Sequence, residues 1–262
     1  MLMTNERTNT MKSACWTDIG IKKKVNQDAC VLMEADTDQG KVGFAAVSDG
    51  MGGLRDGELA SEEMTIALSA WFRNRLPIII SRGGSREDIE KSLGQTILSV
   101  DRQLDRYSRQ HGNCGTTVSG VLLCYGKYLC VNVGDSRVYR IGNRSIMQLT
   151  HDQSLVQQMV DNGEITEEEA KTHPSQSVLL QCIGAGGEAV PEYTSGSYED
   201  GDIFLVCSDG FRHRWSEKEM LGMFPDRKHI KQRNMAAALR RAVEEVMRRG
   251  EKDNITVVAV AP

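Results

Sequence analysis

Residues 42–50 read VGFAAVSDG, a run of apolar residues that stops abruptly at Asp49 and Gly50. Residues 202–210 read DIFLVCSDG and follow the same plan, with Asp209 in the place of Asp49. A short apolar run bounded by turn residues is typical of a buried strand. We therefore expect two buried strands, each of which ends in an aspartate followed by a glycine.

Aspartates also stand at the ends of other expected strands. They are Asp135, which follows residues 129–133, Asp253, which precedes residues 255–260, and Asp28, which precedes the apolar run 30–33. A single aspartate at a strand end is most often a turn residue, and that alternative stays open for each site taken alone. Taken together, the sites favour another explanation. The strand ends of one sandwich converge on its edge, where ionised carboxylates brought close would repel one another.

Such a group of carboxylates needs a cation to neutralise it. No cluster of His or Cys accompanies the aspartates in the sequence, so the expected ion is a hard, oxygen-binding one, Mg²⁺ or Mn²⁺. The glycines after Asp49 and Asp209 would let a backbone carbonyl approach the ion. Two such ions can hold a bridging water, lower its pKa and direct it at a phosphoryl group. The sequence therefore predicts a metal centre suited to phosphoryl chemistry.

The rest of the chain predicts helices outside packed sheets. Apolar residues at helical spacing predict a helix over about 57–75, a second helix that opens with a capping box at Ser85 and Asp88, and a last helix from about 228 to a stop at Gly250. Turn signals at 125–126 and 142–143 predict two hairpins. We expect one α+β domain in which sheet packs on sheet with helices on the outside.

The composition fits one large domain or two small ones. The chain has 262 residues, 40% of them hydrophobic, and 32 Lys and Arg against 36 Asp and Glu, a formal net charge of −4. This charge gives no basic footprint for nucleic acid. No apolar run approaches the roughly 18 residues of a membrane span, and the first ten residues lack the apolar core of a secretory signal. We therefore expect a soluble, cytoplasmic chain with no nucleic-acid or membrane partner.

Two segments are expected to lie outside the core. Residues 1–12 read as a flexible tail, which leaves residues 13–262 as a single domain. Residues 151–191 mix a short helix, an acidic helix start and a Gly-rich stretch, a pattern typical of a mobile insertion. The seven cysteines are scattered without a Cys-x-x-Cys pair, and most stand in apolar strand-like runs. We expect buried thiols rather than a zinc site or a disulfide framework.

At the aspartates the chain resembles the metal-dependent protein serine/threonine phosphatases, the type 2C or PPM family, in a bacterial form with no appended domain. The resemblance runs from about 14 to 261. The motifs stand in family order: Asn26-Gln27-Asp28, Ser48-Asp49-Gly50-Met51-Gly52-Gly53, Gly115-Thr116-Thr117, Val133-Gly134-Asp135-Ser136-Arg137, Leu149-Thr150 with Asp152, Ser208-Asp209-Gly210-Phe211, and Asp253-Asn254-Ile255-Thr256. Any one motif is weak, but the ordered set is specific.

The resemblance implies a four-layer α/β/β/α sandwich, two antiparallel sheets flanked by antiparallel helix pairs, with a binuclear metal centre at one end. Asp49 would bridge two Mn²⁺ or Mg²⁺ ions beside the Gly50 carbonyl. Asp209 and Asp253 would hold one ion, Asp28 would anchor the outer water shell, and Asp135 matches the ligand of a third, weaker ion. In the family a metal-bridging water or hydroxide attacks phosphorus directly, with no phosphoenzyme. Residues 151–191 correspond to a flap beside the site.

The chain departs from the family pattern at three places. Lys23 stands where many members have an arginine that grips the substrate phosphate, and lysine offers a point charge without a bidentate fork; the alternative is that residues 22–24 are merely a solvated basic patch. Met51 replaces a histidine proposed as general acid in eukaryotic members and cannot donate a proton. His213, flanked by Arg212 and Arg214, replaces a carboxylate that helps the third ion.

The function implied is hydrolysis of phosphoserine and phosphothreonine in proteins. The implied partners are phosphoprotein substrates and a cognate serine/threonine kinase, and we expect a monomer. Two alternatives stay open. One is an inactive, pseudophosphatase-type module that only binds phosphoproteins, which Met51 and Lys23 would favour. The other is a different two-metal phosphoesterase such as a nuclease, which the acidic charge balance disfavours.

Overall fold

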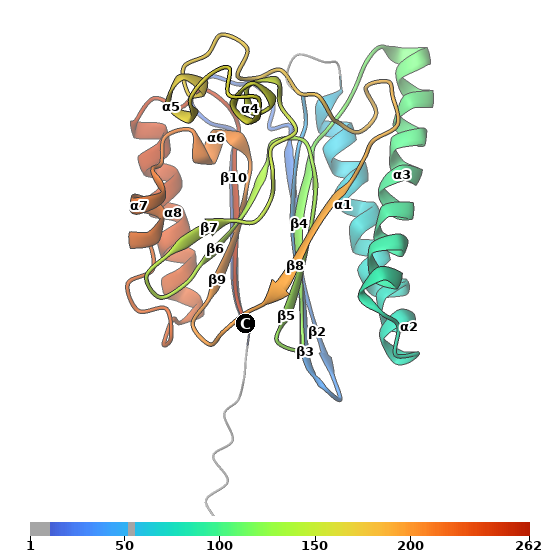
Figure 1. The fold of residues 1–262 in the computed structure, drawn as a ribbon, viewed down its shortest axis with the longest axis vertical. Helices are drawn as coiled ribbons and strands as arrows, with labels where there is room; N and C mark the ends of the chain where they lie inside the picture. Colours follow the sequence, from blue (N-terminus) through green and yellow to red (C-terminus); the bar gives the residue numbers. More distant parts are fainter. Residues whose placement is uncertain (1–10, 52–55) are drawn as a thin grey trace, which may run out of the picture.

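Two packed β-sheets with helices on both outer faces form the molecule (Figure 1). The computed structural model describes residues 11–51 and 56–262. The strand order is β1-β10-β9-β6-β7 in the first sheet and β2-β3-β4-β5-β8 in the second. Neighbouring strands pair antiparallel in both sheets. The predicted four-layer sandwich is therefore confirmed.

The elements have the following bounds. The first sheet contains β1 (Lys12–Asp18), β10 (Ile255–Ala261), β9 (Ile203–Cys207), β6 (Arg137–Ile141) and β7 (Ile146–Gln148). The second contains β2 (Asp28–Thr37), β3 (Gly40–Asp49), β4 (Val118–Cys124), β5 (Lys127–Val133) and β8 (Glu192–Ser197). The helices are α1 (Gly57–Asn74), α2 (Leu76–Ser81), α3 (Arg86–His111), α4 (Leu155–Asp161), α5 (Glu167–Ala170), α6 (Asp209–Arg212), α7 (Glu217–Gly222) and α8 (Gln232–Arg248).

The central strands are apolar on both faces because each sheet is covered twice. On β3, Phe44 and Ala46 pack toward α1 and α3, whereas Ala45 and Val47 face the other sheet. The residues of β9 alternate in the same way between the helix side and the space between the sheets. Successive strand residues point to opposite faces, so a strand buried on both faces shows no polar alternation. This packing explains the unbroken apolar runs in the sequence.

The helices follow their sequence signals closely. The Ser85 hydroxyl accepts from the Asp88 N–H, the Asp88 carboxylate accepts from the Ser85 N–H, and the predicted capping box at the start of α3 is confirmed. Helices α1 and α3 pack together on the second sheet, and α8 packs on β1 of the first. Helix α7 lies beside α8 in Figure 1. Helix α8 begins at Gln232 rather than near 228.

Some elements differ from the sequence expectation. Residues 76–81 form the short helix α2, with Pro77 in its first turn. The sequence predicted no separate element between the helix that ends near 75 and the one that opens at Ser85. Strand β8 was not expected, because most of its residues are polar; it lies at the edge of the second sheet, paired with β5. Residues 1–10 of the predicted tail lie outside the described residues. Strand β1 begins at Lys12, one residue before the predicted domain boundary.

The segment 151–191 lies across one end of the sandwich, where α4 and α5 are seen in Figure 1. Residues 183–189 of this segment, the returning arm, are anchored in the core, which the sequence did not predict. Ile183 is fully buried and pairs with Thr116, and Ala189 is buried beside it. The buried carboxylate of Asp101 on α3 accepts from the Gly184 N–H at 2.8 Å and from the Ala189 N–H at 3.2 Å. The sequence showed no sign of this because the glycines at 184, 186 and 187 interrupt any helical or strand periodicity of the apolar residues.

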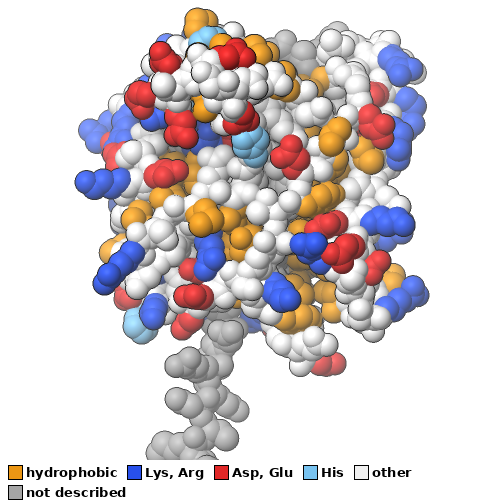
Figure 2. Space-filling view, viewed as in Figure 1, with side chains coloured by type: hydrophobic (Ala, Val, Ile, Leu, Met, Phe, Trp, Pro, Cys, Tyr) orange, Lys and Arg blue, Asp and Glu red, His pale blue; other side chains and the backbone are white. Residues whose placement is uncertain are grey.

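Charges of both signs cover the surface. On the face shown in Figure 2, Lys and Arg side chains are interspersed with Asp and Glu, as the small net charge predicts. In the described part of the chain, no helix combines the length and the apolar character that crossing a membrane requires.

Candidate metal centre

The antiparallel pairing brings four aspartates to one end of the sandwich. Asp28 begins β2 and pairs in register with Asp49, which ends β3. In the other sheet Asp209 follows the end of β9, and Asp253 precedes the start of its antiparallel neighbour β10. The Ser208 hydroxyl donates to Asp28 Oδ2 at 2.8 Å and so joins the two sheets at this end. The strand ends converge as the sequence predicted.

Asp49 and Asp209 lie close enough that each affects the pKa of the other. Burial, followed by the charges of Asp28 and other aspartates, raises the pKa of Asp49 well above its ordinary value. Burial also opposes ionisation of Asp209, but the nearby His213 and Arg212 outweigh it and lower the pKa of Asp209. Carboxylates brought this close disfavour each other's ionisation, and a cation between them would relieve that repulsion.

Asp28 has one oxygen with no partner. Its side chain is buried, and Oδ1 meets no hydrogen-bond donor among the described residues. Burial raises the pKa of Asp28 to about 7, against the hydrogen bonds from Thr256 and Ser208. A buried polar atom left unpaired destabilises a protein by about 1–3 kcal/mol. This oxygen would be satisfied by a cation or by a water that a cation holds.

Gly50 has no room for a side chain. A Cβ at this position would lie 2.3 Å from the Gly57 carbonyl oxygen and 2.5 Å from the Gln27 carbonyl oxygen. The Gly50 N–H donates to the same Gln27 oxygen at 3.0 Å. The glycine thus lets the chain pass between two other segments directly after Asp49, while the role of its carbonyl as a ligand stays a prediction.

Lys23 forms an ion pair with Asp253, one of the predicted metal ligands. Its Nζ is 2.6 Å from Asp253 Oδ1, with 32% of the lysine side chain and 41% of the aspartate side chain exposed. Burial disfavours the ammonium charge, but the hydrogen bond and charge of Asp253 outweigh it and raise the pKa of Lys23. Lys22 and Lys24 are exposed, so the solvated-patch alternative describes them but not Lys23.

The loop that carries Lys23 is tied down by a residue whose role the sequence did not reveal. Asn254 Nδ2 donates to the carbonyls of Ile19 and Val25, and Asn254 Oδ1 accepts from the Gln27 N–H at 2.9 Å. The sequence did contain a signal for this role, because Asn254 directly follows Asp253 in the motif Asp253-Asn254-Ile255-Thr256. A short amide beside a strand start is a frequent partner for loop backbone groups.

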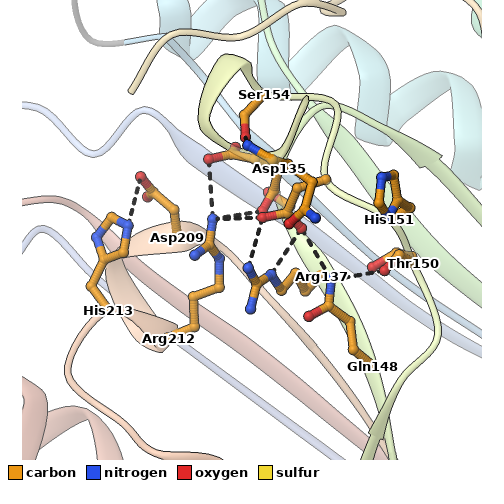
Figure 3. A network of polar contacts seen from close by, with 12 residues as sticks. Asp135, Arg137, Gln148, Thr150, His151, Ser154, Asp209, Arg212 and His213 are labelled. Atoms are coloured by element: carbon orange, nitrogen blue, oxygen red, sulfur yellow. Dashed lines mark hydrogen bonds and ion pairs between the residues drawn. The ribbon is translucent and has the colours of Figure 1, made fainter. Parts of the chain in front are cut away.

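Asp135 meets an arginine. Arg212 Nη2 lies 3.2 Å from Asp135 Oδ2, and Arg137 binds Asp152 with two 2.8 Å contacts in the same network (Figure 3). Burial raises the pKa of Asp135 to about 7, and Arg212 opposes that rise. The contact between Arg212 and Asp135 could not be predicted from the sequence, because residues 77 positions apart form no local pattern.

His213 and Met51, the other two departures from the family pattern, also have defined surroundings in the structure. His213 Nε2 is 3.8 Å from Asp209 Oδ2, and burial lowers the pKa of His213, against the charge of Asp209. The Met51 N–H donates to the Gly115 carbonyl at 3.0 Å, and a Cβ at Gly115 would lie 2.1 Å from Met51 Cε. Met51 therefore packs against the backbone of Gly115. Residues 52–53 of this motif lie outside the described residues.

The donor set fits a hard divalent cation. Within residues 11–51 and 56–262, no three His, Cys, Asp or Glu side chains lie close enough together to hold an ion as they stand. Asp49 instead lies next to Asp209, and Asp253 forms an ion pair with Lys23. All the candidate donors are oxygens, as a hard divalent cation requires. Burial first, and then the charges of neighbouring aspartates, raise the pKa values of Asp28 and Asp49.

Comparison with known proteins gives the family. A family model described as protein phosphatase 2C matches residues 21–257. The serine/threonine phosphatase stp of Listeria monocytogenes serotype 4b is 30% identical over 247 residues, which make up 93% of this chain and 93% of that protein.

Solved structures share the fold over almost the whole length. Serine/threonine phosphatase Stp1 from Staphylococcus aureus has a TM-score of 0.81 at 26% identity, over 97% of this chain and 95% of that one. The catalytic domain of serine threonine protein phosphatase PstP, solved in complex with 2 manganese ions, has a TM-score of 0.75 at 27% identity, over 96% of this chain and 97% of that one. Sequence motifs, fold and family model agree: the chain belongs to the protein phosphatase 2C family.

Proposed function

We propose that this chain is a metal-dependent phosphatase that removes phosphate from phosphoserine and phosphothreonine in proteins. The observation that carries the proposal is the meeting of aspartates from both sheets, where the Asp28 oxygen lacks a partner among the described residues. Family membership supports it, and the relatives above are named serine/threonine phosphatases. The partners that follow are phosphorylated proteins and the kinase that phosphorylates them.

The chain's own residues would hold two Mn²⁺ or Mg²⁺ ions. Asp49 would contact both ions beside the Gly50 carbonyl, Asp209 and Asp253 would hold one, and Asp28 would position surrounding water. When bound, such ions lower the pKa of a water held between them and stabilise negative charge on phosphoryl oxygens. A related phosphatase, PstP, was solved with 2 manganese ions, which supports this choice of metal.

Lys23 is the residue proposed to contact the substrate phosphate. Its ammonium holds Asp253 at 2.6 Å yet stays partly exposed at the same end of the sandwich, so it can turn toward a phosphate oxygen. Lysine supplies one charge whose direction is not fixed, whereas arginine would supply two parallel donors. Since Met51 has no proton to give, the alkoxide leaving group would take its proton from solvent.

The test is phosphate release from a phosphothreonine peptide and from para-nitrophenyl phosphate. We expect activity with Mn²⁺ or Mg²⁺, loss of activity in chelator, and a fall of at least about a hundredfold in kcat/KM for Asp209→Asn, because a metal supplies several kcal/mol of charge stabilisation. Asp36→Asn is the matched control, since Asp36 pairs with Lys41 far along β2 and should keep full activity. Full activity in chelator, or in Asp209→Asn, contradicts the proposal.

A second candidate is a module that binds phosphoproteins without turnover. The contact of Lys23 with Asp253 and the absence of a proton on the Met51 side chain favour it. Titration calorimetry separates the two, because a binding module takes up phosphopeptide in chelator, whereas the phosphatase requires the divalent ion.

A further inference from the structure

Arg212 is a buried guanidinium at the end of α6, three residues after Asp209. Its side chain is 13% exposed. Nη2 donates to the Asp135 carbonyl oxygen at 3.1 Å and to Asp135 Oδ2 at 3.2 Å, and it lies 3.3 Å from Asp152 Oδ2. Arg212 Nε is buried with no hydrogen-bond partner in the described part of the chain. A buried charge is stable only beside an opposite charge, so Arg212 needs a negative partner among Asp135 and Asp152.

Asp152 already has a cation of its own. Arg137 Nε and Nη2 each lie 2.8 Å from its two carboxylate oxygens, a bidentate arrangement, and Gln148 Nε2 adds a contact at 3.2 Å. Figure 3 shows the result as one connected network. Asp135, Arg137, Asp152 and Arg212 place two guanidinium groups beside two carboxyl groups. Arg137 is engaged by Asp152, so Arg212 is the cation in contact with Asp135.

The surroundings of Asp135 do not suit a divalent ion. Mn²⁺ and Mg²⁺ need several oxygen ligands around one point. One carboxylate oxygen and the carbonyl oxygen of Asp135 both accept from Arg212, and a second cation would lie against the guanidinium. Position 213, where the resemblance expects a carboxylate for this ion, is a histidine near Asp209 and Glu251. The third ion that the sequence allowed at Asp135 thus finds its place taken by a positive side chain.

We propose that Arg212 is a built-in cation that stands beside Asp135 in the place of a third divalent ion, so that the chain binds two ions and not three. This inference rests on the proposed function for the two-ion centre itself. Arg212 acts as a positioning residue, because it holds Asp135 on one side and lies next to Asp209 on the other (Figure 3). The positive charge beside Asp135 then does not depend on the concentration of free metal.

The first experiment counts Mn²⁺ ions per full-length chain by titration with electron paramagnetic resonance of the free ion. We expect two ions for the unmodified protein and two for Asp135→Asn, with dissociation constants changed by less than about threefold, while Asp209→Asn loses at least one ion. Three ions, one of which disappears in Asp135→Asn, would overturn the inference and leave the proposed function standing. Binding of no ion would overturn the proposed function and the inference with it.

The second experiment reverses the replacement. The double variant Arg212→Met with His213→Asp removes the guanidinium and restores a carboxylate, and we expect it to bind a third Mn²⁺ that the further change Asp135→Asn abolishes. A merely structural role of Arg212 would not create an ion site, so a count that stays at two in the double variant contradicts the replacement. Arg240→Met is the matched control, because Arg240 is exposed on α8 and should leave the count at two.

Folding of these variants is checked by thermal unfolding in chelator. Breaking a buried ion pair should lower the Tm of Arg212→Met by roughly 10 °C, against less than about 2 °C for Arg240→Met. If Arg212→Met does not fold, Arg212→Lys with His213→Asp keeps a positive charge beside Asp135, and it should still bind two ions. Three ions in that lysine variant would show that a charge at position 212 does not exclude the ion, which overturns the inference.

Discussion

At the scale of one residue, the buried carboxylate of Asp28 lowers the stability of the folded protein when it is ionised and no cation is bound. Its carboxylate is buried, one oxygen has no donor in the described structure, and other aspartates face it. An ionised group in this setting destabilises the folded chain, and its pKa near 7 is the measure of that. The surrounding structure tolerates the arrangement because the site requires it.

Replacing this carboxylate by its neutral isostere should therefore separate stability from metal binding. In chelator at pH 8, Asp28→Asn should raise the Tm by a few degrees, because it removes a buried charge that has no counterion. The same variant should bind Mn²⁺ more weakly than the unmodified protein. Calorimetric unfolding and metal titration measure the two effects. A Tm below that of the unmodified protein would contradict the argument, and Asp36→Asn serves as the exposed control.

Cys15 differs from the sequence expectation of buried thiols. All seven cysteines are free, but only Cys114, Cys130 and Cys207 are buried, and Cys15 on β1 is exposed. A hydrogen bond from Cys30 on the neighbouring edge strand lowers the pKa of Cys15 to about 6, against a smaller effect of burial. The sequence could not show this pair, since the two strands belong to different sheets.

Cys15 should consequently be the most reactive thiol of the chain at pH 7. The thiolate is the nucleophile, and at pH 7 a thiol with a pKa near 6 is mostly ionised, so alkylation of Cys15 by iodoacetamide should rise through pH 6 and level off above it. Mass spectrometry of each cysteine peptide gives the rates. Cys30→Ala should raise the pKa of Cys15 and slow the reaction at pH 7. Equal rates for Cys15 and Cys124 would refute the assignment.

At the scale of elements, α3 supports more than the sheet beneath it. The Asp101 carboxylate on this helix holds two backbone N–H groups of the arm that returns from the segment 151–191. One turn further on, Asp105 accepts from the Gly186 N–H at 3.1 Å, but in an exposed place. A buried carboxylate that accepts two amide protons fixes a loop far better than an exposed one, where water competes.

This difference predicts unequal effects of two matched substitutions. Asp101→Ala should destabilise the protein by about 2–4 kcal/mol and speed proteolytic cleavage within residues 151–191, because two buried N–H groups lose their acceptor. Asp105→Ala should change stability by less than about 0.5 kcal/mol. Chemical denaturation and limited proteolysis measure both. Similar losses for the two variants would show that Asp101 is not the anchor of the arm.

Elements with a strong local signal were predictable, and elements that depend on distant partners were not. The capping box of α3 and the apolar runs of β3 and β9 are visible in the sequence, and the structure confirms them. Strand β8 is polar and owes its conformation to pairing with β5. The same distinction holds in the site, where the aspartates follow from strand ends but the Arg212 contact with Asp135 joins residues 77 positions apart.

At the scale of the whole molecule, stability should depend on pH in a way that metal reverses. The folded chain raises the pKa of Asp28 and Asp135 to about 7 from an ordinary value of 3.8, so folding takes up protons between these values. The contribution of these two acids to stability without metal is therefore largest at low pH within this range and is lost as pH rises from about 4 to 7. Bound Mn²⁺ favours the ionised acids and competes with the protons.

The gain in Tm on adding saturating Mn²⁺ should accordingly be larger at pH 8 than at pH 5.5, by several degrees. Differential scanning calorimetry at the two pH values, with and without chelator, measures this gain. Asp49→Asn, which removes the aspartate proposed to contact both ions, should abolish most of the difference. A gain that is equal at both pH values would mean that these carboxylates do not exchange protons for metal.

The hydrogen bond from Ser208 to Asp28 crosses from one sheet to the other, and the aspartates are divided between the two sheets in the same way. The site therefore exists only when the halves of the sandwich are docked in their final register. A partly assembled chain, with either sheet formed alone, would hold too few of the carboxylates to retain an ion. On the proposed function, turnover would report on completed assembly, and an ion bound to aspartates of both sheets would slow the separation of the sheets.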